Sequence, residues 1–259
     1  MQAVDAGKRK YARLTAVILG LISAVFLSYS ILIAAAYTVV YIDPGYFERE
    51  YEKYDVLSDL PEMTMSKEDG LMAVTDHMKD FLLHGTERDE LQIEVMMDGE
   101  MRPFFSEREL DHMMDVRIIF MSAIRFFGLG IVFAIFLAVF SRLIICHDEP
   151  KIFRYSQGLG MSIGSAASLL GAGLFAFMAS RGGFSKLFVD FHHVMFDNDL
   201  WILDPSKDML INIVPEGFFY DTAIRIGIVF AVYMVIFIIV CLIIFRSAKK
   251  MPDYQYSFI

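Results

Sequence analysis

The sequence offers few of the groups from which enzyme sites are commonly built. It has only two cysteines, one tryptophan and no H-E-x-x-H zinc motif. No G-x-S-x-G elbow, phosphate-binding loop or thiol nucleophile lies on the outer side of its predicted membrane-spanning segments. Cys146 and Cys241 lie near the ends of hydrophobic segments, which favours inert or lipid-modified thiols. These absences argue against nucleotide-driven and thiol-based chemistry, so proton transfer by histidine is the chemistry that the sequence favours.

Hydrophobic residues, by contrast, are abundant. They make up 56% of the chain, and the mean hydropathy is +0.49. Four runs, at residues 14–42, 118–145, 159–180 and 224–245, reach the roughly 20 apolar residues that a helix needs to cross a bilayer. The sequence therefore predicts a membrane protein with an all-α core of four transmembrane helices. Gly160 and Gly164 in the third run have a spacing that allows close contact between helices in lipid.

The basic residues predict the orientation of these helices. Lysine and arginine cluster in segments 1–13, 146–158 and 246–259 and at the adjoining ends of the runs. Because positive charge marks the cytoplasmic side, we expect both termini to be cytoplasmic. Segments 43–117 and 181–223 then face outward, and both are strongly acidic. The first run is far longer than the apolar part of a cleavable signal peptide, so it is interpreted as an uncleaved anchor.

The first outer segment, 43–117, is predicted to form a small α+β cap. Ser66 can cap a helix that runs to about Leu83 and is stopped by Gly85. Residues 91–97 alternate as in a strand, Asp98-Gly99 supplies a turn, and residues 100–104 are predicted to form the returning strand. Ser106 and Glu109 then form a capping box, which opens a helix that continues into the second run.

The second outer segment, 181–223, is predicted to be an interfacial helix and loop. Ser185 can cap a helix over residues 186–196, whose broad apolar face suits a position in the plane of the membrane interface. Trp201 in the following loop is expected at headgroup depth, as is usual for indoles.

His112 is the first candidate for chemistry, because it stands where a helix enters the bilayer. Asp115 lies three residues later and shares its face, so this carboxylate could orient the imidazole as a general acid or base. A surface histidine among charges is the alternative interpretation. Arg125 lies about two turns inside the second run, where a charge is costly. It is expected either to face the site, toward an ester or phosphate oxygen, or to support helix packing.

The second candidate lies in the stretch from Phe191 to Pro205. It holds His192, His193, several carboxylates, an amide and the tryptophan. Only one of the two histidines can point inward, since neighbours on a helix are about 100° apart. A zinc ion held by His112, His192 and an aspartate is conceivable, but no paired ligand motif supports it, and no metal or other cofactor is expected.

Three pieces of the sequence together resemble the bacterial family of lipoprotein intramolecular transacylases. They are residues 105–116, which read Phe-Ser-Glu-Arg-Glu-Leu-Asp-His-Met-Met-Asp-Val, the stretch from Phe191-His192 to Pro205, and Pro215-Glu216-Gly217-Phe218-Phe219. The four-span order agrees as well, so the resemblance covers nearly the whole chain. His193 falls at a position that the family pattern does not specify, so the resemblance favours His192 as the site residue.

The resemblance implies an acyltransferase that moves the sn-2 acyl chain of an S-diacylglyceryl cysteine onto the α-amine of the same cysteine. His112 and His192 would be catalytic, and the expected supporting or substrate-binding residues are Asp115, Arg125, Asn198, Asp199, Trp201 and Asp204. The implied partners are a diacylated lipoprotein and membrane lipids, without nucleic acid, at the outer side of the bacterial cytoplasmic membrane. Two alternatives stay open: a non-enzymatic membrane receptor or accessory protein with an acidic outer domain, and a metal-dependent lipid hydrolase.

Overall fold

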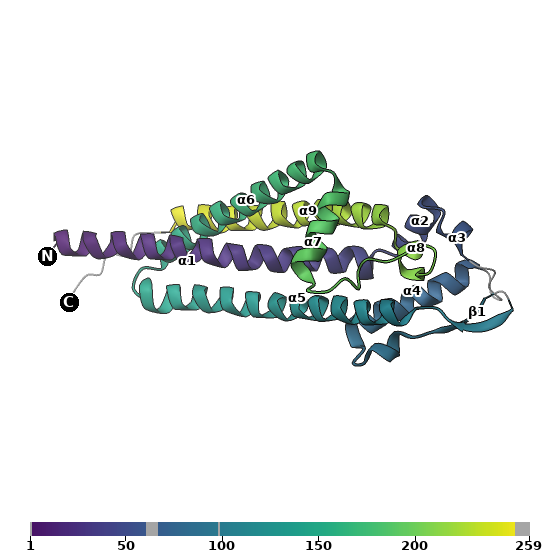
Figure 1. Ribbon diagram of the computed structural model, residues 1–259. Helices are drawn as coiled ribbons and strands as arrows, with labels where there is room; N and C mark the ends of the chain where they lie inside the picture. The colour runs from purple at the N-terminus through teal and green to yellow at the C-terminus, as the bar shows by residue number, and fades with distance from the viewer. Residues whose placement is uncertain (1, 61–66, 98, 252–259) are drawn as a thin grey trace. The chain divides into compact units, whose positions relative to one another are not determined.

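The protein is mostly helical. The computed structural model describes residues 2–60, 67–97 and 99–251 (Figure 1). Its long helices are α1 (Gln2–Tyr37), α5 (Glu107–Phe140), α6 (Pro150–Gly182) and α9 (Glu216–Lys249), and the short π-helices η1 (Thr38–Ile42) and η3 (Ser141–Ile145) extend α1 and α5. All four are long and apolar enough to cross a membrane, over Ala6–Ile42, Glu107–Ile145, Pro150–Met178 and Glu216–Lys249. The prediction of four membrane-spanning helices is confirmed, and most of them extend beyond the hydrophobic runs because their polar flanks are helical too.

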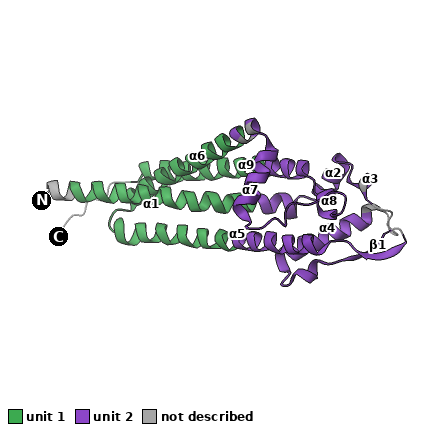
Figure 2. Cartoon of the chain, in the orientation of Figure 1, with its two compact units in different colours: residues 1–35, 125–177, 227–259 green, residues 36–124, 178–226 purple. Residues whose placement is uncertain are grey.

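The chain divides into two compact units (Figure 2). One comprises residues 1–35, 125–177 and 227–259, and the other comprises residues 36–124 and 178–226. Both units therefore contain parts of all four long helices, and the second also contains the shorter α-helices and both strands.

In the first unit, glycines let α1 and α6 approach closely. A Cβ atom at Gly160 would overlap the backbone oxygen of Val17, and one at Gly164 would lie 2.7 Å from the Cβ of Ala24. Helix α1 also contacts α5, because Ser30 Oγ donates a hydrogen bond of 3.0 Å to the carbonyl oxygen of Phe127. The expected close packing at Gly160 and Gly164 is confirmed, and its partner is α1.

The predicted hairpin is present in the second unit. Strands β1 (Glu94–Met97) and β2 (Glu100–Pro103) pair antiparallel, with Glu94 opposite Pro103. Gly99 has a φ of +82°, a value that favours glycine, while Asp98 of the expected turn lies outside the described residues. The first strand is shorter than predicted because the 3₁₀-helix η2 (Arg88–Leu91) precedes it, and its residue Leu91 is fully buried.

The helix predicted before the hairpin is α4 (Lys67–His84). Gly85 follows it, and its N–H bonds the carbonyl oxygen of Phe81, so the predicted end is confirmed. The expected cap, Ser66, lies outside the described residues.

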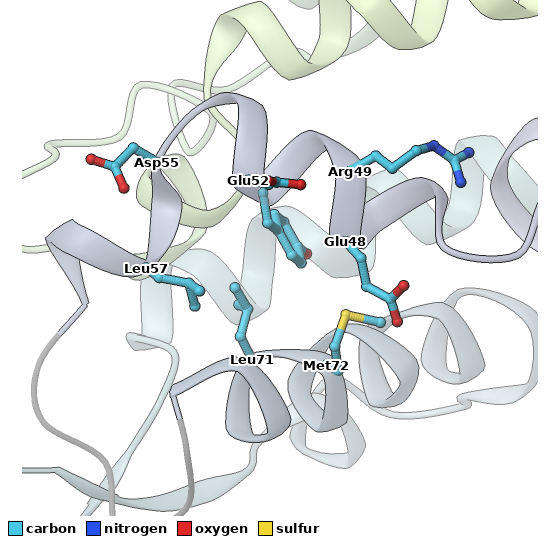
Figure 3. A pocket seen from close by; sticks show the side chains of 8 residues that line it. Glu48, Arg49, Glu52, Asp55, Leu57, Leu71 and Met72 are labelled. Carbon is cyan, nitrogen blue, oxygen red and sulfur yellow. The ribbon is translucent and has the colours of Figure 1, made fainter.

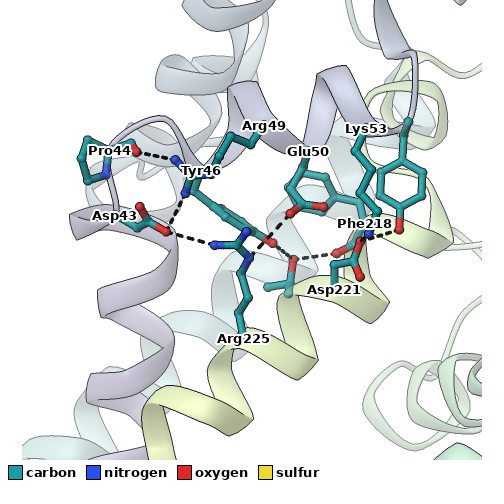
Figure 4. Close-up of polar contacts among 11 residues, drawn as sticks. Asp43, Pro44, Tyr46, Arg49, Glu50, Lys53, Phe218, Asp221 and Arg225 are labelled. Carbon is teal, nitrogen blue, oxygen red and sulfur yellow. Dashed lines mark hydrogen bonds and ion pairs between the residues drawn. The ribbon is translucent and has the colours of Figure 1, made fainter.

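Helices α2 (Tyr46–Lys53) and α3 (Val56–Asp59) were not predicted from the sequence. Helix α2 packs on the start of α9 through an aromatic cluster of Tyr46, Phe47, Tyr51 and Phe218. Polar groups surround this contact (Figure 4). The hydroxyls of Tyr46 and Thr222 lie 2.5 Å apart, and Arg225 pairs with Asp43 at 3.3 Å.

The helix predicted in the second outer segment is α7 (Phe184–Met195), and α8 (Met209–Ile213) follows it. The predicted Ser185 cap is wrong. Gly183, with a φ of +82°, precedes the helix, so Ser185 lies inside the first turn and its hydroxyl donates to Glu216. Phe191 and Val194 are exposed, at 50% and 82%, as suits a helix at a membrane interface.

The contact between α1 and α6 leads to a stability prediction. The substitution Gly160→Ala should lower the free energy of unfolding by about 1–3 kcal/mol, the usual cost of overpacking, because the added methyl meets backbone that cannot move aside. Gly171→Ala on the same helix is the control, since a Cβ there meets nothing within 4 Å. Thermal unfolding in detergent micelles measures both, and equal melting temperatures for the two variants would contradict the packing described here.

Candidate functional site

His112 and His192 come together in the second unit. Their ring centroids lie 6.2 Å apart with an angle of 33° between the rings. His112 is on the second turn of α5 and His192 is on the last turn of α7, and the two residues are only 6% and 8% exposed. Two residues that are far apart in the sequence therefore form one buried pair.

Aromatic side chains surround the pair. The ring centroid of His192 lies 4.2 Å from Phe188 and 4.8 Å from Trp201, and His112 lies edge-on to Phe196 at 5.2 Å. His193 is exposed and contacts Trp201 by its edge. Of the two neighbouring histidines, His192 is thus the one that points inward.

The backbone fixes the tautomer of His192. Its Nδ1 lies 2.7 Å from the carbonyl oxygen of Phe188, and because a carbonyl only accepts, Nδ1 carries the hydrogen. The other nitrogen, Nε2, then holds the lone pair. Burial lowers the pKa of His192, and the neighbouring His193 lowers it further against the opposing effect of the backbone bond. The ring is therefore neutral at pH 7, with Nε2 able to accept a proton.

Two other nitrogens at this place have no hydrogen-bond partner among the described residues. They are Nδ1 of His112 and the indole Nε1 of Trp201, and both atoms are buried. A buried polar group without a partner costs about 1–3 kcal/mol. A bound molecule with a carbonyl oxygen could accept from the indole N–H, and a polar group of the same molecule could satisfy His112.

Asp115 does not hydrogen-bond to His112, contrary to expectation. Its Oδ2 instead accepts a hydrogen bond of 2.9 Å from the side-chain nitrogen of Asn198. The side-chain oxygen of Asn198 accepts from the N–H of Leu200, and the backbone oxygen of Asp199 accepts from Arg108. These expected site residues thus hold the loop after α7 against α5 rather than orienting the imidazole.

A second set of polar contacts, which we call the Glu109 network, holds the same loop further along. One oxygen of the buried Glu109 carboxylate accepts the N–H of Ser106 at 2.6 Å, which completes the predicted capping box. The other oxygen accepts the N–H of Leu210 at the start of α8. Asp208 accepts from the Ser106 hydroxyl at 3.1 Å and from the N–H of Asp204 at 2.8 Å.

Sequence reasoning missed part of this arrangement. The capping-box pattern predicted that Glu109 caps α5. It did not predict that the second carboxylate oxygen of Glu109 bonds to Leu210, or that Asp208 bonds to Ser106 and Asp204. Part of the aromatic surround of His192 could have been found, because Phe188 lies four residues before it and shares its helical face.

Asp204 and Arg125 are the two remaining expected site residues. Asp204 is exposed and accepts from Ser206, and these bonds lower the pKa of its carboxyl. Arg125 belongs to the first unit, and its side chain is exposed without a hydrogen bond or ion pair to any described residue. No group of three histidine, cysteine, aspartate or glutamate side chains within the described part of the chain could hold a metal ion.

A separate cavity of about 570 Å³ lies between α2, α3 and α4 (Figure 3). Its lining includes Glu48, Glu52 and Asp55 with one arginine, Arg49, and apolar side chains such as Leu71. Neither histidine of the pair lines it, so it is distinct from the buried histidine pair.

The chain is similar to known transacylases. The family model for the lipoprotein intramolecular transacylase Lit matches residues 21–219. A structure of the membrane-integral lipoprotein intramolecular transacylase Lit from Bacillus cereus has a TM-score of 0.62 at 22% identity, covering 90% of this chain and 95% of that one. Two variants of that protein, with one histidine replaced by arginine or alanine, have TM-scores of 0.59 and 0.61 at 20% identity. They cover 96% and 97% of this chain, and 97% and 100% of their own. No curated protein matches the chain.

The Glu109 network leads to a second prediction. The substitution Glu109→Gln should destabilise the protein by about 1–3 kcal/mol, because an amide offers one acceptor oxygen where two backbone N–H groups need one each. Glu107→Gln is the matched control, since Glu107 is exposed and makes a surface ion pair with Arg88, which is worth at most about 1 kcal/mol.

Hydrogen exchange gives the local readout for this prediction. In the Glu109→Gln variant the amide of Leu210 should exchange faster, whereas in Glu107→Gln its protection should stay at the wild-type level. Unchanged exchange at Leu210 in both variants would show that the network does not hold the loop.

Proposed function

The chain belongs to the lipoprotein intramolecular transacylase family and is a multi-pass membrane protein, and on this basis we propose that it converts diacylated lipoproteins to their lyso form. In the proposed reaction the α-amine of an S-diacylglyceryl cysteine attacks the sn-2 ester of the same residue. The C–N bond forms, the ester C–O bond breaks, and the proton lost by the amine ends on the sn-2 oxygen. The products are an amide and a free hydroxyl on one molecule.

The observation that carries this proposal is the buried pair of His112 and His192. Within it, Nε2 of His192 accepts the proton of the attacking amine and returns it to the leaving oxygen. The lowered pKa keeps this nitrogen unprotonated at pH 7, as a general base requires. A free α-amine has a pKa near 7.7–8.0, so an appreciable fraction is already neutral and the base need only complete the transfer.

The buried indole N–H of Trp201 lacks a partner among the described residues and suits the ester carbonyl, and Nδ1 of His112 does so in the tautomer that carries its hydrogen on that nitrogen. Negative charge develops on this oxygen during attack, and N–H donors in a water-poor site stabilise it. Because amine and ester belong to one substrate, the protein need only fold it into attack geometry, which accounts for several kcal/mol of the barrier. Ester-to-amide exchange is downhill and requires no nucleotide or other cofactor.

The proposed location is the outer face of the bacterial cytoplasmic membrane, with both termini in the cytoplasm. The distribution of basic residues supports this orientation. The exposed apolar side chains of α7 beside His192 support a site at the interface. Acyl chains are expected to enter sideways from the bilayer, because drawing them into water would cost about 0.8 kcal/mol per CH₂.

Mass spectrometry of lipoprotein N-termini tests the reaction itself. When the protein is expressed in cells that make only diacylated lipoproteins, the N-terminal peptides should keep their total mass, while one acyl chain moves from the glyceryl group to the amine. Fragment ions distinguish the two isomers. A loss of one acyl chain would support the hydrolase alternative, and no change at all would leave a receptor or accessory role.

Substitution of the histidines tests the site. His112→Ala and His192→Ala should each reduce the rate of acyl transfer at least about a hundredfold, the lower range for a lost acid–base group, without reducing membrane insertion. His193→Ala is the matched control, since its ring is exposed, and its effect should be much milder. Wild-type rates in the His192→Ala variant would exclude the proposed base.

Cysteine labelling tests the orientation. With Cys146 and Cys241 replaced, single cysteines at Gly99 or Lys207 should react with a membrane-impermeant reagent applied to intact cells. A cysteine at Lys249 should react only after the membrane is opened. Labelling of the Lys249 position alone in intact cells would reverse the orientation and place the site on the cytoplasmic side.

A further inference from the structure

A second pocket lies in the first unit, in the part of the chain that the transacylase proposal does not use. It has a volume of about 430 Å³. Arg9 and Arg13 on α1, Lys151 and Tyr155 on α6, and Lys249 on α9 line it. We call this the basic pocket, and we propose that it binds the phosphate headgroup of an anionic phospholipid.

The charge of the basic pocket favours an anion. Four cationic side chains line it, and the only carboxylate among the described lining residues is Glu149. Arg9 pairs with Glu149 at 2.7 Å, whereas Arg13 makes no ion pair with any described residue. An arginine fork can contact two phosphate oxygens at once, and the Tyr155 hydroxyl can donate to a third.

The position of the basic pocket along the helices favours a lipid over a free anion. Arg13 directly precedes the apolar run of α1, and Lys249 follows that of α9, so the cations lie at the depth of lipid headgroups. Leu14 and Ile18, on α1 just beyond Arg13, are 57% and 45% exposed. Acyl chains below a bound phosphate would lie along these side chains.

The floor of the basic pocket is apolar and well packed. Ile152, which lines the pocket, is 5% exposed and packs against Ala16 in a buried cluster. The basic pocket therefore adjoins a packed contact between α1 and α6, and a headgroup bound there would join three of the membrane-spanning helices. Basic pockets between such helices are a known mode of headgroup binding.

Native mass spectrometry of the full-length protein in neutral detergent tests the proposal. We expect phosphatidylglycerol to be retained, and phosphatidylcholine and inorganic phosphate to be lost under the same conditions. The double variant Arg13→Gln/Lys151→Gln should bind phosphatidylglycerol at least about tenfold more weakly, which corresponds to about 1.4 kcal/mol. Lys8→Gln/Lys10→Gln removes the same charge from the same end of α1 but outside the basic pocket, and its binding should match the wild type.

Three outcomes would overturn the proposal. Equal weakening in the two double variants would show that net surface charge, not the pocket, attracts the lipid. Retention of phosphate at the same strength would identify a free-anion site. Equal retention of phosphatidylcholine would show adhesion of any lipid. None of these readouts depends on acyl transfer, so the result stands apart from the proposed reaction.

Discussion

The buried carboxylate of Glu109 is the interaction on which the arrangement of the second unit depends. One of its oxygens caps the first turn of α5 and the other holds the start of α8. Since His112 is on the next turn of α5, the cap also fixes the start of the helix that carries it. Since α8 ends the loop that follows α7, the same carboxylate limits where Trp201 can lie. Asp208 adds two more hydrogen bonds to this connection.

Two polar contacts then close the loop on the helix, from Asn198 to Asp115 and from Arg108 to the backbone of Asp199. The rings of both histidines then lie among aromatic side chains. Burial lowers the pKa of His192, so its imidazole is neutral at pH 7, which suits a general base. The loop leaves Asp199 and Asp204 exposed, whereas the indole nitrogen of Trp201 is buried.

Much of the fold could be predicted from the sequence because its signals are local. Runs of apolar residues determine the four long helices, the Ser106-to-Glu109 spacing determines the start of α5, and alternation with a glycine turn determines the hairpin. Helices α2 and α3 could not be predicted, because α2 is stabilised by an aromatic contact with Phe218, which is distant in the sequence. The predicted start of α7 was wrong because Gly183, not Ser185, precedes the helix. A serine near a helix start predicts a cap, but the sequence does not show that its hydroxyl bonds to Glu216 instead.

The candidate site could be predicted in part. Helix geometry indicated that only one of His192 and His193 can point inward, the resemblance favoured His192, and burial agrees. The hydrogen-bond partner of Asp115 could not be predicted from its spacing to His112. A carboxylate on the same helical face as a histidine can also bond to a residue that is distant in the sequence, and here Asn198 is that residue. Arg125 was assigned from its depth in the second run alone, and depth does not determine the direction of a side chain.

The most direct test of the account is the rate of acyl transfer by the purified double variant His112→Ala/His192→Ala on a diacylated lipopeptide, compared with each single variant. If both rings act on one bound ester, the double variant is little slower than the slower single variant, because removing either ring already disables the unit. Losses that multiply would contradict the account, since the two histidines would then contribute independently.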